Sequence, residues 1–158
     1  MIKPAANYAI EIEGLYNEKM YDISSFYYIG NEENYPIVLS NNEEQSGRYS
    51  WAVLDNEKVI GYIDYWIDWT TRCASSFGMY CFDESNPVFG LAIRDVMKML
   101  IEEYRLHRIE WRMISGNPVQ KHYDKFCEKY GGNRVILHDI CKDRYGKFHD
   151  EYIYEIIQ

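Results

Sequence analysis

Residues 76–106 read SFGMYCFDESNPVFGLAIRDVMKMLIEEYRL, which is a short apolar run, a turn and a long amphipathic segment. The run Ser76–Asp83 predicts a strand, and the segment after it predicts a helix with one wide buried face. Its apolar residues recur at helical spacing: Val88, Phe89, Ala92, Ile93, Val96, Met97, Leu100, Ile101 and Tyr104. A strand that leads into a helix start can hold an anion on free backbone N–H groups. The turn Asp83–Ala92 is therefore either a phosphate site or only the start of a helix.

Strands are predicted on both sides of this unit. The runs Tyr49–Leu54 and Val59–Trp69 are rich in β-branched and aromatic residues and are joined by a polar turn, so they predict an antiparallel hairpin. Ile109–Ile114 follows the helix and predicts a strand parallel to Ser76–Asp83, because the connection contains a helix.

The C-terminal third predicts a second helix and a hairpin. Asn117-Pro118 suits an N-cap and a first helical position, and Gly131-Gly132 suits a helix end. Val135–Cys141 and Phe148–Ile157, with a Gly146-containing turn between them, predict the hairpin.

The first 48 residues have weaker patterns. Tyr8–Leu15 alternates between apolar and polar residues and predicts a strand. Glu18–Ile29 is compatible with a helix or, in part, with a strand. Asn31–Gly47 is polar and predicts a surface loop.

Composition restricts the class of protein. A chain of 158 residues, 47% hydrophobic and 27% charged, predicts one soluble globular domain spanning residues 1–158. The net charge of −8 argues against a nucleic-acid partner and favours cationic substrates such as amines. No apolar run approaches the ~20 residues of a membrane span. The four cysteines form no C-x-x-C pair and no secretory leader is present, so we expect free thiols and a cytoplasmic protein.

The predicted order is hairpin, strand, helix, strand, helix, hairpin, which resembles the GNAT superfamily of acyl-CoA-dependent N-acyltransferases from about Arg48 onward. This resemblance implies an α/β (α+β) fold with a mixed central sheet of about six to seven strands. The sheet would be mostly antiparallel, with one central parallel pair and flanking helices. The strings ISGNP, YDKF and YGKFHDE also resemble a GNAT-like branch found in phages and prophages of Gram-positive bacteria.

The family binds the CoA diphosphate with a loop of pattern Q/R-x-x-G-x-G/A. Here the loop is Pro87–Ala92, in which Gly90 and Ala92 match and Pro87 replaces the Gln or Arg. Asp83 and Glu84 stand where basic residues are usual, and an N-cap at Asn86 would place Gly90 inside the helix. The resemblance implies acetyl-CoA as co-substrate, bound by Cys81, Phe82, Asp83, Phe89, Gly90, Leu91, Ala92, Arg94 and Asn117.

The resemblance also implies a mechanism. A Tyr on the second helix would protonate the departing thiolate, and Tyr123 is assigned that role, although Cys127 occupies the position when counted back from Gly131. The backbone N–H near Phe82 would polarise the thioester carbonyl. Glu84 or Glu110 would take the proton of the amine.

Three other groupings are open to different interpretations. Asp64 and Asp68 share a face of their strand and would bind an ammonium group or form a solvated surface. Glu110 and Arg112 would form a cross-strand ion pair in place of a base. The Cys and His residues of the C-terminal part match no standard zinc spacing, so no metal is expected.

The expected function is acetyl-CoA-dependent transfer of an acetyl group to a primary amine of a small molecule, peptide or protein. The alternative is a GNAT-like module of phage origin that has lost catalysis and binds another protein, because Pro87 and the displaced Tyr depart from the family pattern. An aromatic-rich sheet edge is compatible with a homodimer.

Overall fold

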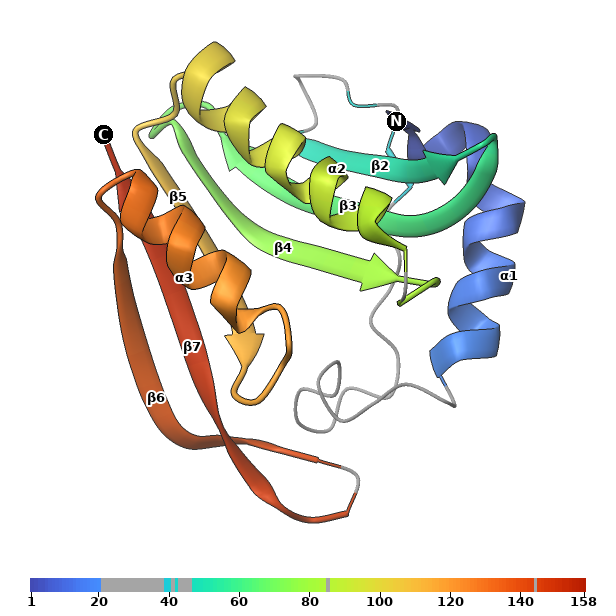
Figure 1. Cartoon of the computed structure of the whole chain (residues 1–158). Helices are drawn as coiled ribbons and strands as arrows, with labels where there is room; N and C mark the ends of the chain where they lie inside the picture. The colour runs from blue at the N-terminus through green and yellow to red at the C-terminus, as the bar shows by residue number, and fades with distance from the viewer. Residues whose placement is uncertain (21–38, 41, 43–46, 85, 144) are drawn as a thin grey trace.

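The computed structural model describes residues 1–20, 39–40, 42, 47–84, 86–143 and 145–158, which contain a seven-stranded sheet with the order β1-β2-β3-β4-β5-β7-β6 (Figure 1). Neighbouring strands are antiparallel except for the parallel pair β4 and β5. The predicted fold class is therefore confirmed. The strands are β1 Ile2–Pro4, β2 Arg48–Asp55, β3 Lys58–Asp68, β4 Cys73–Cys81, β5 Arg108–Ile114, β6 Asn133–Lys142 and β7 Phe148–Ile157.

Helices cover both faces of the sheet. They are α1 Ala9–Met20, which follows a 3-10 turn; α2 Pro87–Lys98, which continues as a π-helical segment to Glu103; and α3 Gln120–Lys129. Because successive strand residues point to opposite faces, neighbouring residues of β2 enter different cores. Val53 packs in the cluster that contains α2 and α3, whereas Ala52 packs in the cluster that contains α1. Thus α2 and α3 lie on one face and α1 on the other.

The contact between α2 and β3 depends on a glycine. A Cβ atom at Gly61 would lie 2.4 Å from two ring atoms of Phe89, so the Phe89 ring rests directly on the β3 backbone. Phe89 is buried together with Ala92 and Val96, as the helical spacing predicted. This packing fixes where the first turn of α2 lies relative to the sheet.

The strand predicted for Tyr8–Leu15 is wrong, because these residues lie in the 3-10 turn and α1. Ile10 and Ile12 suggested an alternating strand, yet Ile10 is 90% exposed and Ile12 is fully buried. The buried pair is Ile12 and Tyr16, four residues apart on one helical face. Most of Glu18–Ile29 and Asn31–Gly47 lies outside the described residues.

The second predicted helix begins later than expected. Asn117 does cap, because its Oδ1 accepts the N–H of Val119 at 3.0 Å, but Pro118 and Val119 form a turn and α3 starts at Gln120. Its end is as predicted. Gly131 has φ +67°, its N–H donates to Glu128 O, and the N–H of Gly132 donates to Cys127 O, which is a Schellman motif.

Strand β6 is an edge of the sheet and is kinked in its middle. Its register with β7 shifts between Leu137 and Cys141, and Asp139 has φ +53°. Asp150 of β7 holds the kink, since its carboxylate accepts the N–H of Asp139 at 3.0 Å and contacts the His138 ring at 3.2 Å. The edge strand is therefore interrupted in its middle.

Candidate functional site

Strands β4 and β5 pair only where they begin. In the described residues, Cys73 pairs with Arg108 and Ala74 with Ile109, and the ladder goes no further. From there the two strands diverge, so that among the described strands the later part of β4 pairs with β3 alone (Figure 1). The divergence leaves backbone groups of two neighbouring strands available to a ligand.

Tyr123 of α3 lies beside this divergence on the helix-covered face. Its ring packs edge-on against Trp111 of β5, with centroids 6.0 Å apart, and its hydroxyl donates to the sulfur of Met79 of β4 at 3.0 Å. The side chain is 9% exposed. Tyr123 therefore reaches from one diverging strand to the other with its proton directed at a sulfur atom.

The same aromatic cluster contains a buried donor. The Trp111 indole is 1% exposed and stacks on Tyr154 at 5.3 Å, and its Nε1–H has no acceptor among the described residues. A buried donor without a partner costs about 1–3 kcal/mol. A ligand atom that accepted this hydrogen bond would recover that cost.

The carbonyl-polarising donor was predicted near Phe82, and the N–H of Phe82 itself is not available for this role. That N–H donates to Ile60 O at 2.9 Å, and the Phe82 ring is buried in the α1-side core. Donors alternate along an antiparallel ladder, so the N–H groups of Cys81 and Met79 point away from β3. They face the side on which β4 and β5 diverge, beyond the last pair of that ladder.

The start of α2 is a poor fit to a diphosphate. Pro87 has no N–H, the N–H of Val88 donates to Asn86 Oδ1 at 3.0 Å, and that of Phe89 donates to Asn86 O at 3.4 Å. The helix therefore begins before Gly90. The Asn86 amide also donates to the carboxylates of Asp55 and Asp83, which places two acids at this helix start. A diphosphate would have to displace the Asn86 cap.

The other residues assigned to CoA surround this helix start in different ways. Gly90 and Leu91 are exposed, and a Cβ atom at Gly90 would meet nothing within 4 Å. Cys81 is half-buried and its thiol donates to Asp83 O at 3.2 Å, while burial raises its pKa. Arg94 is exposed and pairs with Asp95 at 3.1 Å. Ala92 and Phe89 are core residues, so only their backbones could contact a ligand.

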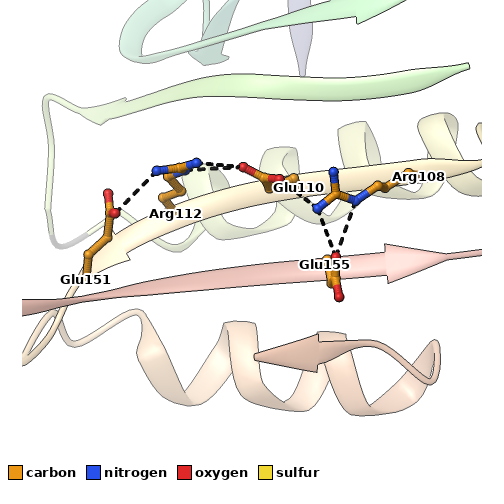
Figure 2. Close-up of polar contacts among 5 residues, drawn as sticks. All are labelled: Arg108, Glu110, Arg112, Glu151 and Glu155. Atoms are coloured by element: carbon orange, nitrogen blue, oxygen red, sulfur yellow. Dashed lines mark hydrogen bonds and ion pairs between the residues drawn. The ribbon is translucent and has the colours of Figure 1, made fainter. Parts of the chain in front are cut away.

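Glu110 and Glu84 do not resemble positioned bases. Figure 2 shows that Glu110 lies between Arg108 and Arg112 of its own strand; each of its oxygens is 2.9 Å from a guanidinium nitrogen. The predicted ion pair with Arg112 thus exists but runs along β5, and cross-strand pairs join these arginines to Glu151 and Glu155. Glu84 is exposed in the turn after β4.

Asp64 of β3 differs from the other acids. It is 6% exposed on the α1 side of the sheet, and burial raises its pKa to about 7, against the opposing effects of the Arg48 charge and the Gly78 N–H. Asp68 only caps a turn, with its carboxylate accepting the N–H of Thr70 at 2.9 Å. The predicted solvated face is therefore wrong for Asp64, which is buried, whereas the ammonium site stays a prediction. The useful signal was an acid within the apolar run Val59–Trp69.

Cys127 packs as a structural residue. Its thiol donates to Asn133 O at 3.3 Å, and burial raises its pKa. A Cβ atom at Gly132 would lie 2.6 Å from this sulfur and 2.4 Å from Glu155 O, which explains why the chain has glycine there and no aromatic residue. Of the two residues considered for the acid, Tyr123 is the one beside the diverging strands.

The described ranges lack a metal-binding cluster and a membrane-spanning helix. They contain no group of three or more His, Cys, Asp or Glu placed to hold a metal ion. Within the same ranges, no helix combines the length and apolar character needed to span a membrane.

Comparisons with known proteins find similarity in structure alone. No protein-family description and no curated sequence matches the chain. Solved structures that match include the ribosomal-protein-alanine N-acetyltransferase from Brucella melitensis (TM-score 0.69, 14% identity, 100% of this chain and 99% of that chain). An N-acetyltransferase from Staphylococcus aureus Mu50 matches with TM-score 0.69 and 12% identity over 99% of this chain and 97% of that one. The spermidine/spermine N-acetyltransferase from Vibrio cholerae matches with TM-score 0.57 and 19% identity over 94% and 74%. The seven-stranded sheet, the single parallel pair that diverges and the helices on both faces are thus those of the GNAT fold.

Proposed function

We propose that the protein is an N-acetyltransferase that transfers the acetyl group of acetyl-CoA to a primary amine. The observation that carries this proposal is the divergence of β4 and β5 with the Tyr123 hydroxyl beside it, directed at the Met79 sulfur. The matched structures named above are N-acetyltransferases, which supports the same reaction class. The net charge of −8 favours a cationic acceptor.

In the proposed reaction the thioester lies between the two diverging strands. One of the two N–H groups of β4 that point away from β3, that of Met79 or that of Cys81, would donate to its carbonyl oxygen, where negative charge develops as the amine attacks. The two groups are about 6.7 Å apart along the strand, so only one of them can serve the same oxygen. The sulfur of the thioester takes the place of the Met79 sulfur as acceptor of the Tyr123 hydrogen bond. Tyr123 then donates its proton to the departing thiolate.

The described residues provide fewer favourable contacts for the diphosphate than for the rest of acetyl-CoA. The exposed backbone at Gly90 allows close approach, but the Asn86 cap and the Asp55 and Asp83 carboxylates oppose an anion. This observation favours the alternative function, a GNAT-fold module that binds a protein partner without catalysis. The two functions differ in whether acetyl-CoA binds.

Calorimetric titration with acetyl-CoA tests the proposal. We expect saturable binding that Gly90→Glu weakens at least about tenfold, because the added carboxylate would meet the diphosphate. Gly14→Glu is the matched control: it adds the same charge on α1, where a side chain also has open space, and it should leave binding unchanged. No heat of binding at high-micromolar acetyl-CoA would refute the enzyme, and would favour the protein-binding module.

A further inference from the structure

Among the described residues Asp64, Asp143 and Glu151 are buried carboxyl groups, and the reaction above gives Asp64 no role. It pairs in register with Gly78 of β4, and a Cβ atom at Gly78 would lie 2.1 Å from Asp64 Oδ1. The carboxylate therefore lies directly over the β4 backbone, in space that only a glycine leaves free. Gly78 belongs to the part of β4 beyond its last pair with β5.

Asp64 and Tyr123 contact consecutive residues of β4. Gly78 is followed by Met79, whose sulfur accepts the Tyr123 hydrogen bond on the helix-covered face. Consecutive strand residues face opposite sides of a sheet. The carboxyl group and the phenol therefore lie on the two faces of β4 at adjacent residues, where the strand borders the divergence.

We propose that Asp64 is the catalytic residue that takes the proton of the acceptor amine; this role rests on the proposed function. The nitrogen lone pair forms the C–N bond to the thioester carbonyl carbon, and the N–H proton passes to the Asp64 carboxylate. The C–S bond breaks, and the sulfur takes the Tyr123 proton. Proton exchange with water restores both side chains, so amine and acetyl thioester become amide and thiol.

The surroundings of Asp64 suit this role. Among the described residues, the groups that face it are the Arg48 guanidinium of β2, the Tyr62 hydroxyl of β3 and the Gly78 N–H of β4. All three favour the charged carboxylate, but burial outweighs them and holds its pKa at about 7. A base with a pKa near the working pH both accepts a proton readily and is present in its basic form. Turnover should therefore rise with pH through about 7.

The test compares Asp64→Asn with Asp68→Asn, a matched change on the same strand that removes only a turn cap. Turnover of acetyl-CoA is followed from about pH 5.5 to 9 with two probe amines, spermidine and a peptide with an N-terminal alanine, together with calorimetric binding of acetyl-CoA. For Asp64→Asn we expect kcat to fall at least about 100-fold and no longer to rise with pH near 7, while the affinity for acetyl-CoA stays unchanged. Asp68→Asn should keep the wild-type profile.

A second variant keeps the experiment decisive if Asp64→Asn does not fold. Gly78→Ala retains the carboxyl group but pushes it aside, and the Tyr80 ring edge, 3.2 Å from the new Cβ atom, has to shift slightly as well. We expect it to lower kcat while acetyl-CoA still binds. If the wild-type protein turns over and Asp64→Asn or Gly78→Ala is fully active, the role of Asp64 is overturned but the proposed function is not. Wild-type protein that binds no acetyl-CoA, or that acetylates neither probe, overturns the proposed function and the role of Asp64 with it.

Discussion

The two sides of β4 are built in opposite ways. On the β3 side the described ladder has seven register pairs, and glycines at positions 61 and 78 let a ring and a carboxylate lie on the backbone. On the β5 side the ladder has two pairs and then stops. A strand held firmly along one side can present the groups on its other side in fixed positions. The well-packed side thus positions the donors that the diverging side offers to a ligand.

The largest effect should come from the diverging side. Tyr123→Phe removes the proton directed at the Met79 sulfur, and we expect kcat to fall about 100- to 1000-fold with little change in acetyl-CoA affinity. Tyr130→Phe, just beyond the same helix, removes a hydroxyl that donates to Glu102 and should leave kcat unchanged. Full turnover by Tyr123→Phe would exclude Tyr123 as the acid.

On the well-packed side, Gly61→Ala should affect stability. The new Cβ atom would meet the Phe89 ring at 2.4 Å and Tyr80 O at 2.9 Å, so we expect a loss of about 2–3 kcal/mol in the free energy of unfolding. Urea denaturation measures it. Gly14→Ala is the control: its Cβ atom meets nothing within 4 Å, so the protein should gain about 0.5–1 kcal/mol. Equal stability of the two variants would show that α2 is not anchored at Gly61.

Asp64→Asn should change the pH dependence of stability as well as of turnover. The pKa of Asp64 is raised from 3.8 to about 7 in the folded protein, so between these values the folded state holds a proton that the unfolded state has released. Stability therefore falls as pH rises through this window, and the penalty is complete above pH 7. Asp64→Asn lacks this penalty. We expect it to exceed wild type by roughly 4 kcal/mol at pH 8 and by little at pH 4, in urea denaturation at both pH values.

A variant whose advantage does not grow with pH would show that Asp64 is ionised normally in the folded protein. Asp68→Asn is again the control. The pKa of Asp68 is lowered, chiefly by a side-chain hydrogen bond from Thr71, so its replacement should not produce a gain that grows with pH.

The smallest effect concerns the helix start beside β4. Asn86→Ala removes the cap of Val88 and should cost about 1 kcal/mol of stability, while acetyl-CoA should bind at least as well because the Val88 N–H becomes available. Asn117→Ala removes the equivalent hydrogen bond to the Val119 N–H, in the turn before α3 and in the same Asn-Pro-Val sequence, so its stability loss should be similar. Weaker acetyl-CoA binding by Asn86→Ala would mean that the cap itself contacts the ligand.

Much of the fold was predictable because its signals are local. The helical spacing of Val88 to Leu100 predicted α2, and the Asn86 cap predicted its first residue. The Gly131 helix end and both hairpins also follow from short patterns. The α1 prediction was wrong because Ile10 and Ile12 mimic a strand over a few residues, whereas the burial of Ile12 with Tyr16 depends on the sheet beneath them.

The site was less predictable because it depends on register. The direction of the Phe82 N–H is decided by its pairing with Ile60, and the residues alone do not specify that pairing. Likewise, the helical connection predicts the parallel pair, but the sequences of β4 and β5 do not indicate the residue at which the two strands separate. The sequence shows Asp64 as an acid within an apolar run, but its contact with Gly78 joins residues 14 positions apart through the β3–β4 ladder.

The kink in β6 has a consequence for how the protein behaves at high concentration. An edge strand that is long, straight and apolar can pair with an edge strand of another molecule and cause aggregation. Strand β6 exposes Val135, Ile136 and Ile140. The left-handed residue Asp139 interrupts the row of edge N–H and C=O groups between them, and the Asp150 carboxylate already occupies its N–H. The bulge thus opposes the addition of a strand from another molecule along the β6 edge of the sheet.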